Sequence, residues 1–286
     1  MDILYQIRVR QDTFSAAEAR IAQLILSDIG FAASASLDEL AVRADVSSAT
    51  LSRFARSVGC RDLRDLRLQL AQASGVGKRF FDTGNQPEQS AFFRQIVSDI
   101  ESTLHEHLDG FNGGHFADAV KLLGEASMIH AFGMGGCSSV CCDELQVRLV
   151  RLGYAIAACR DGVMMRVTAA TLGPQHALIV CSLTGLTPEL IKAVQLARNY
   201  GAKVIAITRP GTPLAELADV VLALQGVETS FIYKPTAARY GMLLAIDVLA
   251  TELALSMPHA SQERLRRIKL ALDDYRGGDD GLPLGD

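Results

Sequence analysis

The 286 residues of the chain suffice for two domains, and the content of 49% hydrophobic and 21% charged residues is ordinary for a globular protein. No apolar run reaches the roughly 18 residues that cross a bilayer, and the N-terminus lacks a signal-peptide core, so the sequence predicts a cytoplasmic protein without a membrane partner. The net charge of -4 conceals a basic stretch, because residues 43–79 carry eight Lys and Arg against three Asp, whereas residues 80–286 sum to -6. Such a local excess suits DNA binding, although a solvated helical face would give the same pattern.

The first 77 residues are predicted to form an all-α domain of helices separated by short breaks. Two Ser-x-x-Glu capping boxes, at 15–18 and 36–39, indicate helix starts, because each serine can accept a hydrogen bond from the backbone N–H three residues on. A third helix is expected to begin after Ser47, to bury an apolar face and to end at Gly59.

The stretch SLDELAVRADVSSATLSRFARSVG, residues 36–59, has the proportions of a helix-turn-helix. In that motif a support helix and a short turn precede a second helix, whose N-terminal turns enter the major groove of DNA. An unrelated helical bundle with a serine-rich cap is the alternative interpretation. In the DNA-binding interpretation Ser48, Ala49 and Arg53 contact base edges, and Ser47, Thr50, Ser52 and Arg56 contact phosphates.

A linker and a connecting helix are predicted after the helical domain. Residues 74–90 mix Gly, Ser, Pro and polar groups, and apolar residues then recur at helical spacing from Phe92 to Leu104. The predicted organisation is a helical domain over 1–77, a linker and connecting helix over 78–110, an α/β domain over 111–276 and a disordered tail over 277–286.

Short apolar runs that alternate with helical stretches predict a parallel sheet in the second domain. This alternation is typical of βαβ units, which give a five-stranded parallel sheet with helices on both faces, an αβα sandwich. Ligands of such folds bind at the carboxyl ends of the strands, so the functional loops should follow Phe132 and Cys181. The strand candidates are Met128–Phe132, Tyr154–Ala158, Ala177–Cys181, Lys203–Ile207 and Val220–Leu224.

Two segments of the predicted sheet carry the pattern of a phosphate site. The first, HAFGMGGCSSVCCDEL, passes through a glycine-rich turn into a helix, but it lacks the third glycine of the dinucleotide fingerprint. The second, CSLTGLTPELI, supplies three hydroxyls just before a helix. A plain strand-to-helix turn is the alternative for either segment alone. The residues expected to form the site are Gly135, Gly136, Cys137, Ser138, Ser182, Thr184, Gly185 and Thr187.

Both modules resemble those of a known family. The second loop resembles the S-x-S/T-G-x-T-x-E signature of SIS (sugar isomerase) domains, and VSSATLSRFARSVGCRDLRDLRLQL resembles the helix-turn-helix of the RpiR/MurR regulators, which join these modules in this order. The likeness extends from about Thr13 to Leu270, and FIYKPTAARYGMLLAIDVLATEL is similar to the closing helix of the family, with Arg239 and Asp247. The resemblance implies that Ser182, Thr184 and Thr187 contact the phosphate of a sugar phosphate, and that SIS domains form a homodimer or a dimer of dimers.

The resemblance is strongest to the HexR-like branch, which regulates hexose and Entner-Doudoroff metabolism. It implies a DNA-binding transcriptional regulator of sugar and central carbon metabolism, with double-stranded operator DNA as partner and 2-keto-3-deoxy-6-phosphogluconate as the effector to test first. One departure concerns the first loop, where Cys137 stands at the position of the family's usual serine. A thiol is a poorer hydrogen-bond partner, so either Ser138 takes over the sugar contact or the ligand differs.

Other functions remain as alternatives to regulation. A sugar-phosphate isomerase or lyase with an accessory helical domain would need a general base, for which Glu228 and Glu252 are candidates, but acidic residues at such positions are more often solvated. A nucleotide-binding α/β protein is the other alternative. The six histidines have no metal-binding spacing, so we expect no metal. For a regulator we also expect no cofactor and no catalytic residue.

The six cysteines show no spacing typical of disulfide scaffolds, so disulfides are not expected. Cys137 and Cys141 lie one helical turn apart, which would also suit a metal or redox sensor. Packing of small buried residues on the sheet is the simpler interpretation. Within it, Cys137 is the one thiol expected to be reactive.

Overall fold

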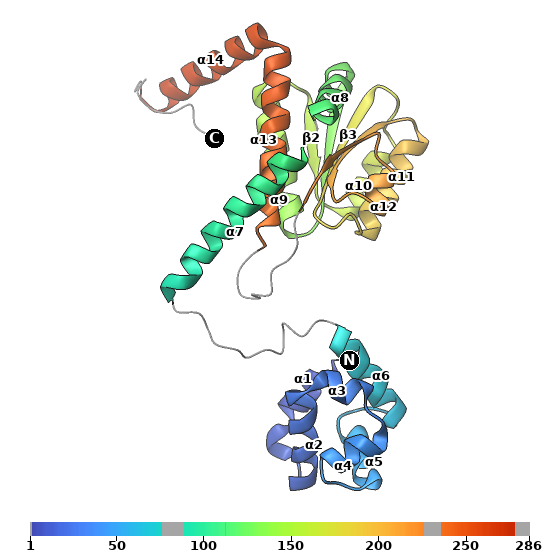
Figure 1. Ribbon diagram of the computed structural model, residues 1–286. Coiled ribbons are helices and arrows are strands. Elements are labelled where there is room, and N and C mark those ends of the chain that lie inside the picture. Colours follow the sequence, from blue (N-terminus) through green and yellow to red (C-terminus); the bar gives the residue numbers. More distant parts are fainter. Residues whose placement is uncertain (1, 76–88, 112, 226–235, 278–286) are drawn as a thin grey trace. The chain divides into compact units, whose positions relative to one another are not determined.

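The structure, a computed structural model, describes residues 2–75, 89–111, 113–225 and 236–277 (Figure 1). Its contacts divide the chain into two compact units, which we call the N-terminal unit (2–75) and the C-terminal unit (89–277). The linker predicted over 74–90 is too long, because Ser74 and Gly75 complete one helix and Gln89 begins the next. Residues 76–88 and, from the predicted tail, 278–286 lie outside the described residues.

The N-terminal unit consists of helices joined by short turns. Both predicted capping boxes form, with the serine accepting from the backbone of the glutamate and the glutamate accepting from the backbone of the serine. The third predicted helix begins after Ser47, whose hydroxyl caps it, and its chain turns away at Gly59, which has a φ of 92°. The elements are α1 (Ile3–Val9), the 3-10 turn η1 (Gln11–Thr13), α2 (Ala16–Ser27), α3 (Ile29–Ser34), α4 (Leu37–Arg43), α5 (Ser48–Ser57) and α6 (Leu63–Gly75).

One side of α5 forms the centre of the core of this unit. Leu51, Phe54 and Val58 are completely or almost completely buried, and the Phe54 ring lies 5.4 Å from that of Phe14. Their spacing along α5 places them on one face, which leaves the opposite face to solvent. The core therefore fixes which side chains of α5 point outward.

The turn between α4 and α5 is held by an arginine of α2. Arg20 donates from Nε to the carbonyl oxygen of Ala44 at 3.1 Å and from Nη2 to that of Asp45 at 2.8 Å. Asp45 has a φ of 51°, a left-handed conformation that aspartate tolerates better than most residues. Because these bonds satisfy carbonyls at the end of α4, they fix the direction in which α5 leaves the turn.

The C-terminal unit is built on one parallel sheet with the strand order β2-β1-β3-β4-β5 (Figure 1). The predicted five-stranded parallel sheet is confirmed, but β2 starts two residues later than expected, because Gly153 and Tyr154 still form the turn that ends the preceding helix. The strands are β1 (Met128–Gly133), β2 (Ile156–Cys159), β3 (His176–Ser182), β4 (Lys203–Thr208) and β5 (Val220–Ala223).

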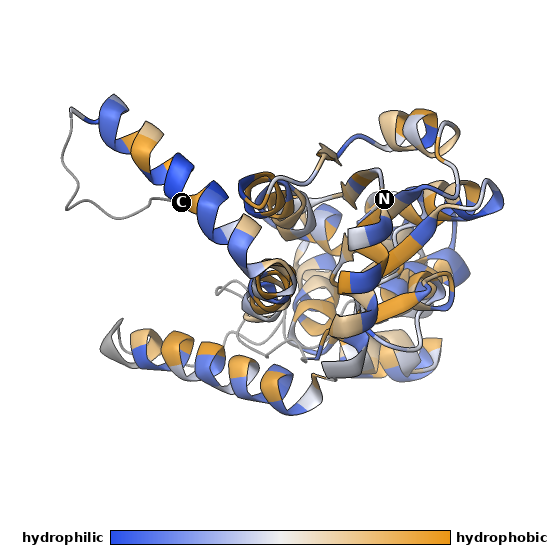
Figure 2. Cartoon of the chain, turned by 90° about the horizontal axis from the view of Figure 1, so that it is seen from above, coloured by the Kyte–Doolittle hydropathy of each residue, from blue (hydrophilic) through white to orange (hydrophobic). Residues whose placement is uncertain are grey.

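Helices cover both faces of this sheet. Alternate strand residues point to opposite sides: Ile179 belongs to a core with α8, α9 and α13, whereas Leu178 and Val180 belong to a core with α10, α11 and α12. The outer helices alternate between hydrophilic and hydrophobic residues along their ribbons (Figure 2). The helices are α7 (Gln89–Gly110), α8 (Gly113–Glu125), α9 (Gly136–Arg151), α10 (Gly162–Ala169), α11 (Pro188–Asn199), α12 (Pro213–Glu216), α13 (Ala238–Ser256) and α14 (Pro258–Tyr275).

None of the described helices is by itself long and apolar enough to cross a membrane. Only α13 and α14 taken together reach that length and apolarity, and they are bent by 111°. Within the C-terminal unit, α13 packs its apolar residues against α9 and the sheet.

Candidate phosphate site and nucleic-acid interface

The outward face of α5 carries the residues predicted to contact DNA. Arg53 and Arg56 are exposed, as are the residues at the start of the helix, whereas the inward face is buried. A second helix with small polar residues at its N-terminus can approach the major groove closely, because no bulky side chain precedes the arginines. The exposed predicted residues are Ser47, Ser48, Ala49, Arg53 and Arg56, and the half-exposed ones are Thr50 and Ser52.

Hydrogen bonds among the polar residues of α5 orient Arg53. The Ser47 hydroxyl accepts from the Thr50 backbone N–H at 3.2 Å, and the Ser47 and Thr50 hydroxyls lie 2.9 Å apart. Thr50 Oγ1 in turn accepts from Arg53 Nη2 at 3.3 Å. The guanidinium is therefore steered along the exposed side of the helix, where a base edge or a phosphate would be met.

The two predicted phosphate loops meet at the point where the strand order reverses. β1 and β3 are adjacent and parallel, with Gly133 opposite Cys181, so the loops that follow them leave from neighbouring positions on the carboxyl edge. The chain then turns to opposite faces of the sheet, into α9 on one side and α11 on the other. The predicted location after Phe132 and Cys181 is thus the topological switch point, where ligands of this class of fold bind.

The glycine-rich loop after β1 is shaped by close backbone contacts. A side chain at Gly133 would place its Cβ 2.1 Å from the carbonyl oxygen of Ser138, and Gly135 has a φ of 80°, so both positions require glycine. Ser139 donates from its hydroxyl to the Gly135 carbonyl at 2.6 Å. Of the two residues considered for the sugar contact, Ser138 is 8% exposed and Cys137 is half-buried.

The loop after β3 buries one of the three predicted hydroxyl residues and leaves the other two near the surface. Ser182, 3% exposed, accepts a hydrogen bond from the Gly185 N–H at 3.0 Å. Thr184 is exposed and accepts from the Leu186 N–H at 3.3 Å. Thr187 is half-exposed and stands at the N-cap of α11 without a side-chain capping bond. The hydroxyls of Thr184 and Thr187 are therefore the more accessible groups for an anion.

The last residue of β4 and the segment that follows it pack against this loop, and the sequence pattern did not indicate them. A Cβ on Gly185, which has a φ of 67°, would lie 2.2 Å from Thr212 Oγ1 and 2.9 Å from Thr208 Oγ1. The Gly185 carbonyl accepts from the Leu214 N–H at 3.3 Å. Thr208 is completely buried, and its hydroxyl has no hydrogen-bond partner among the described residues.

Cys137 lies beside a second thiol and an arginine. Its Sγ is 3.6 Å from Cys141 Sγ, and hydrogen bonding from Cys141 lowers the pKa of Cys137 to about 7, with a smaller contribution from the charge of Arg239 on α13. The same contact and burial raise the pKa of Cys141. Cys137 is thus the thiolate-forming member of the pair, and the proximity of Arg239 was not evident from the sequence.

Cys137 is expected to react with iodoacetamide at least about 100-fold faster than Cys60, whose pKa burial raises to about 11. The thiolate is the nucleophile, so the rate at Cys137 should rise with pH through a midpoint near 7. A time course of alkylation, read by peptide mass spectrometry on the folded protein, measures both rates. Equal rates at the two cysteines would contradict the assignment, and Arg239→Gln should slow Cys137 alone.

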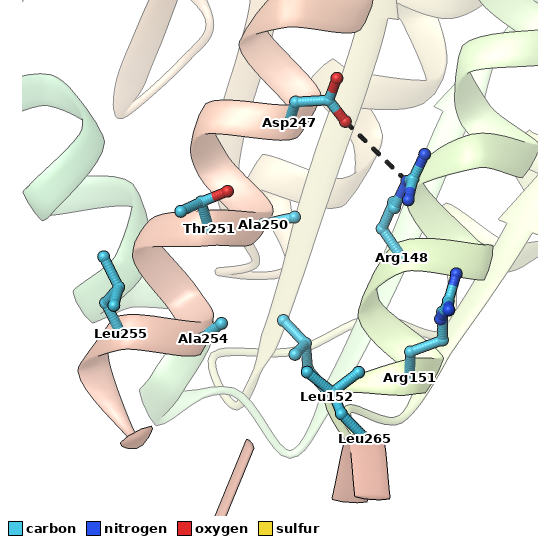
Figure 3. A pocket seen from close by; sticks show the side chains of 9 residues that line it. All are labelled: Arg148, Arg151, Leu152, Asp247, Ala250, Thr251, Ala254, Leu255 and Leu265. Carbon is cyan, nitrogen blue, oxygen red and sulfur yellow. Dashed lines mark ion pairs between the residues drawn. The ribbon is translucent and has the colours of Figure 1, made fainter. Parts of the chain in front are cut away.

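A separate open hollow of about 370 Å³ lies among α9, α13 and α14 (Figure 3). Arg148, near the C-terminal end of α9, bonds Glu144 at 2.6 Å and lies 3.9 Å from the carboxylate of Asp247 across the hollow. Because α9 runs back from the carboxyl edge, its end lies near the amino edge of the sheet. Most of the other lining residues are apolar, and all of the lining comes from helices and from Leu152 at the end of α9, without a glycine-rich loop.

The described residues contain no group of three His, Cys, Asp or Glu that could hold a metal ion. Of the carboxylates near the loops, Glu189 stands in the first turn of α11, directly after the loop that follows β3. Glu252 is exposed on α13, 13 residues beyond Arg239 and hence about 20 Å further along the helix. The other candidate base, Glu228, lies outside the described residues.

Comparison with known proteins gives matches for both units and for the whole chain. Residues 1–75 match the helix-turn-helix domain of the rpiR family, and residues 122–252 match the SIS domain. The HTH-type transcriptional regulator HexR of Pseudomonas aeruginosa is 35% identical over 95% of each chain. HexR of Escherichia coli strain K12 is 31% identical over 100% of this chain and 99% of its own. The solved structure of the Vibrio vulnificus NanR protein complexed with ManNAc-6P has a TM-score of 0.60 at 23% identity and covers 94% of this chain and 98% of its own.

The helix-turn-helix of the N-terminal unit and the SIS fold of the C-terminal unit together define a transcription regulator. The likeness of fold to NanR extends over 94% of the chain and so includes both units. The chain belongs to the RpiR family, and it is similar to the HexR regulators over almost its whole length.

Proposed function

We propose that this regulator binds operator DNA through α5 and that a phosphorylated sugar, bound by the loops after β1 and β3, controls its operator affinity. The observation that carries the proposal is the meeting of both loops at the switch point, with Gly133 opposite Cys181. There the N-terminus of α9, loop N–H groups and the Thr184 and Thr187 hydroxyls can surround an anion. The coupling free energy between effector and operator would be about 1 to 3 kcal/mol, a 5- to 150-fold change in affinity.

The effector we propose to test first is 2-keto-3-deoxy-6-phosphogluconate, which the HexR-like branch suggests. NanR was solved with a phosphorylated sugar, ManNAc-6P, and this supports the same chemical class for the C-terminal unit here. Cys137 and Ser138, both in the first turn of α9, are the residues proposed to lie nearest the sugar, with Ser138 supplying the hydroxyl that Cys137 lacks. We further propose that the protein works in the cytoplasm as a homodimer or a dimer of dimers.

We propose no enzymatic activity for the chain. The support is that Glu252 lies about 20 Å along α13 from Arg239, away from the loops. The rival is a sugar-phosphate isomerase, since SIS domains take their name from that activity. Incubation of the protein with hexose and pentose phosphates, followed by product analysis, separates the two: turnover would favour the rival.

A gel shift on the DNA upstream of the gene, with a panel of sugar phosphates, tests the proposed function. One phosphosugar should release the wild-type protein from the DNA, and the same sugar without its phosphate should not, because the proposed contacts of the loops are to the phosphate. A Thr184→Ala/Thr187→Ala double variant should need at least about tenfold more effector, since it removes both accessible hydroxyls. Thr251→Ala, an exposed threonine in the hollow of Figure 3, is the matched control and should behave as wild type. If the double variant were released from the DNA at the same phosphosugar concentration as the wild-type protein, the assigned site would be wrong.

A further inference from the structure

His107 of α7 is a completely buried histidine that has no part in the proposed contacts to DNA or effector. Its Nδ1 lies 2.7 Å from the carbonyl oxygen of Thr103, and its Nε2 lies 3.0 Å from the backbone nitrogen of Gln225. A carbonyl oxygen only accepts and a backbone N–H only donates, so Nδ1 carries the proton and Nε2 accepts. The two bonds therefore define one neutral tautomer, which joins α7 to the segment after β5.

The imidazole also lies directly against α13. A Cβ on Gly241 would lie 2.2 Å from His107 Nε2, so the ring occupies the space that a side chain of α13 would otherwise fill. The ring of Phe111, the residue that directly follows α7, lies edge-on at 5.9 Å from the imidazole, measured between ring centroids. His107 is thus enclosed by two helices and bonded to a third segment, and its position cannot change without moving one of them.

The partners of His107 are neighbours of both phosphate loops. Gln225 follows Leu224, whose N–H donates to the carbonyl of Thr208 at 2.8 Å, and Thr208 lies beneath Gly185 of the second loop. Gly241 is two residues after Arg239, whose charge acts on Cys137 of the first loop. Along the chain, α7 is the first described helix after the N-terminal unit. One side chain therefore connects the supports of the effector site to the helix that follows the DNA-contacting unit.

We infer that His107 is a positioning residue that couples effector binding to α7 and, through α7, to operator affinity. A shift of the loops on binding a phosphosugar displaces Gln225 or the first turns of α13. The hydrogen bond from the Gln225 N–H to His107 Nε2 is directional, so it transmits that displacement to α7. An apolar contact at this position would let the two segments move past each other. The inference rests on the proposed function, because it presupposes a phosphosugar in the loops.

The test compares two variants of the full chain that each keep one of the two bonds. His107→Gln can place its amide oxygen near Nε2 and accept from Gln225, whereas His107→Asn can replace only the Nδ1 bond to Thr103. The operator Kd is measured with and without saturating 2-keto-3-deoxy-6-phosphogluconate, and calorimetry gives the Kd of that phosphosugar. His107→Gln should retain the wild-type change in operator Kd within about threefold, and His107→Asn should reduce it to less than about twofold.

If His107 had only a structural role, any loss of coupling would follow the loss of thermal stability in the two variants. We instead expect both variants to lose similar thermal stability and to keep their phosphosugar affinity within about threefold, while only His107→Asn loses the coupling. His105→Asn, an exposed histidine on the same helix, is the matched control and should behave as wild type. Gly241→Ala, which pushes on the imidazole, should reduce the coupling as His107→Asn does.

Two outcomes overturn the inference, and they are distinguishable. Equal coupling in His107→Gln and His107→Asn, whether retained or lost, removes the role of the Gln225 bond while the proposed function stands. Absence of phosphosugar binding and of operator release in the wild-type protein overturns the proposed function and the inference together.

Discussion

Replacing Arg53 by alanine should weaken operator binding by about 1 to 3 kcal/mol, a 5- to 150-fold rise in Kd, and relax the preference for operator over unrelated DNA. Arg53 is exposed on α5 and oriented by Thr50, so the variant removes a contact without disturbing the core. Fluorescence anisotropy with operator and scrambled duplexes, repeated at several salt concentrations, measures the affinity and the specificity. The free energy of unfolding should change by less than about 0.5 kcal/mol.

Arg64→Ala is the matched control for Arg53, because it removes the same charge from an exposed position on α6. Loss of a positive charge alone would weaken binding to the operator and to the scrambled duplex equally. It would also lower the salt dependence of the binding constant by about one released counterion. If Arg64→Ala reduced the operator preference as much as Arg53→Ala, the placement of the DNA-reading face on α5 would be wrong.

Gly185→Ala should abolish the response to the effector while leaving effector-free operator binding within about threefold of wild type. The alanine would have to adopt a φ of 67°, which costs about 1 to 2 kcal/mol, and its Cβ would meet Thr212 Oγ1 at 2.2 Å. The loop would have to move, and the Ser182 bond and the Thr184 hydroxyl would move with it. Calorimetric titration should show effector affinity reduced more than tenfold.

Gly211→Ala separates backbone strain from the steric clash. Gly211 also has a left-handed φ, 69°, but a Cβ there meets no atom within 4 Å. This variant should lose some thermal stability and keep the effector response. A loss of response equal to that of Gly185→Ala would mean that the loop after β3 is not the phosphate site.

The elements that the sequence predicted well are those whose signals are local. Ser15 and Ser36 each have glutamate three residues on, and both capping boxes form. The apolar runs of the inner strands identified β1, β3 and β4 to within one residue at each end. By contrast, α3 has only six residues, and so short a helix shows little periodicity; its N-cap is Asp28, whose carboxylate accepts from the Phe31 N–H at 2.9 Å.

The supports of the candidate site depend on tertiary contacts and could not be predicted in this way. The register between β3 and β4 places Thr208 opposite Ser182, and only the folded loop places Gly185 above it. The sequence likewise could not show that Ser182, one of the three predicted hydroxyl residues, is buried and accepts a hydrogen bond within the loop. His107 had no distinguishing pattern at all, since its partners Gln225 and Gly241 are more than 100 residues away along the chain.

The division of the hydrophobic residues into separate cores determines the order in which a newly synthesised chain can fold. The hydrophobic core of α1 to α6 is built from residues 3–73, so it is complete once residue 75 has left the ribosome. The sheet has a higher contact order, because its paired residues lie far apart in the sequence: Met128 of β1 can pair with His176 only after β3 has been synthesised. N-terminal units fold first during synthesis, so the nascent polypeptide acquires a folded helix-turn-helix before the sheet and its loops exist.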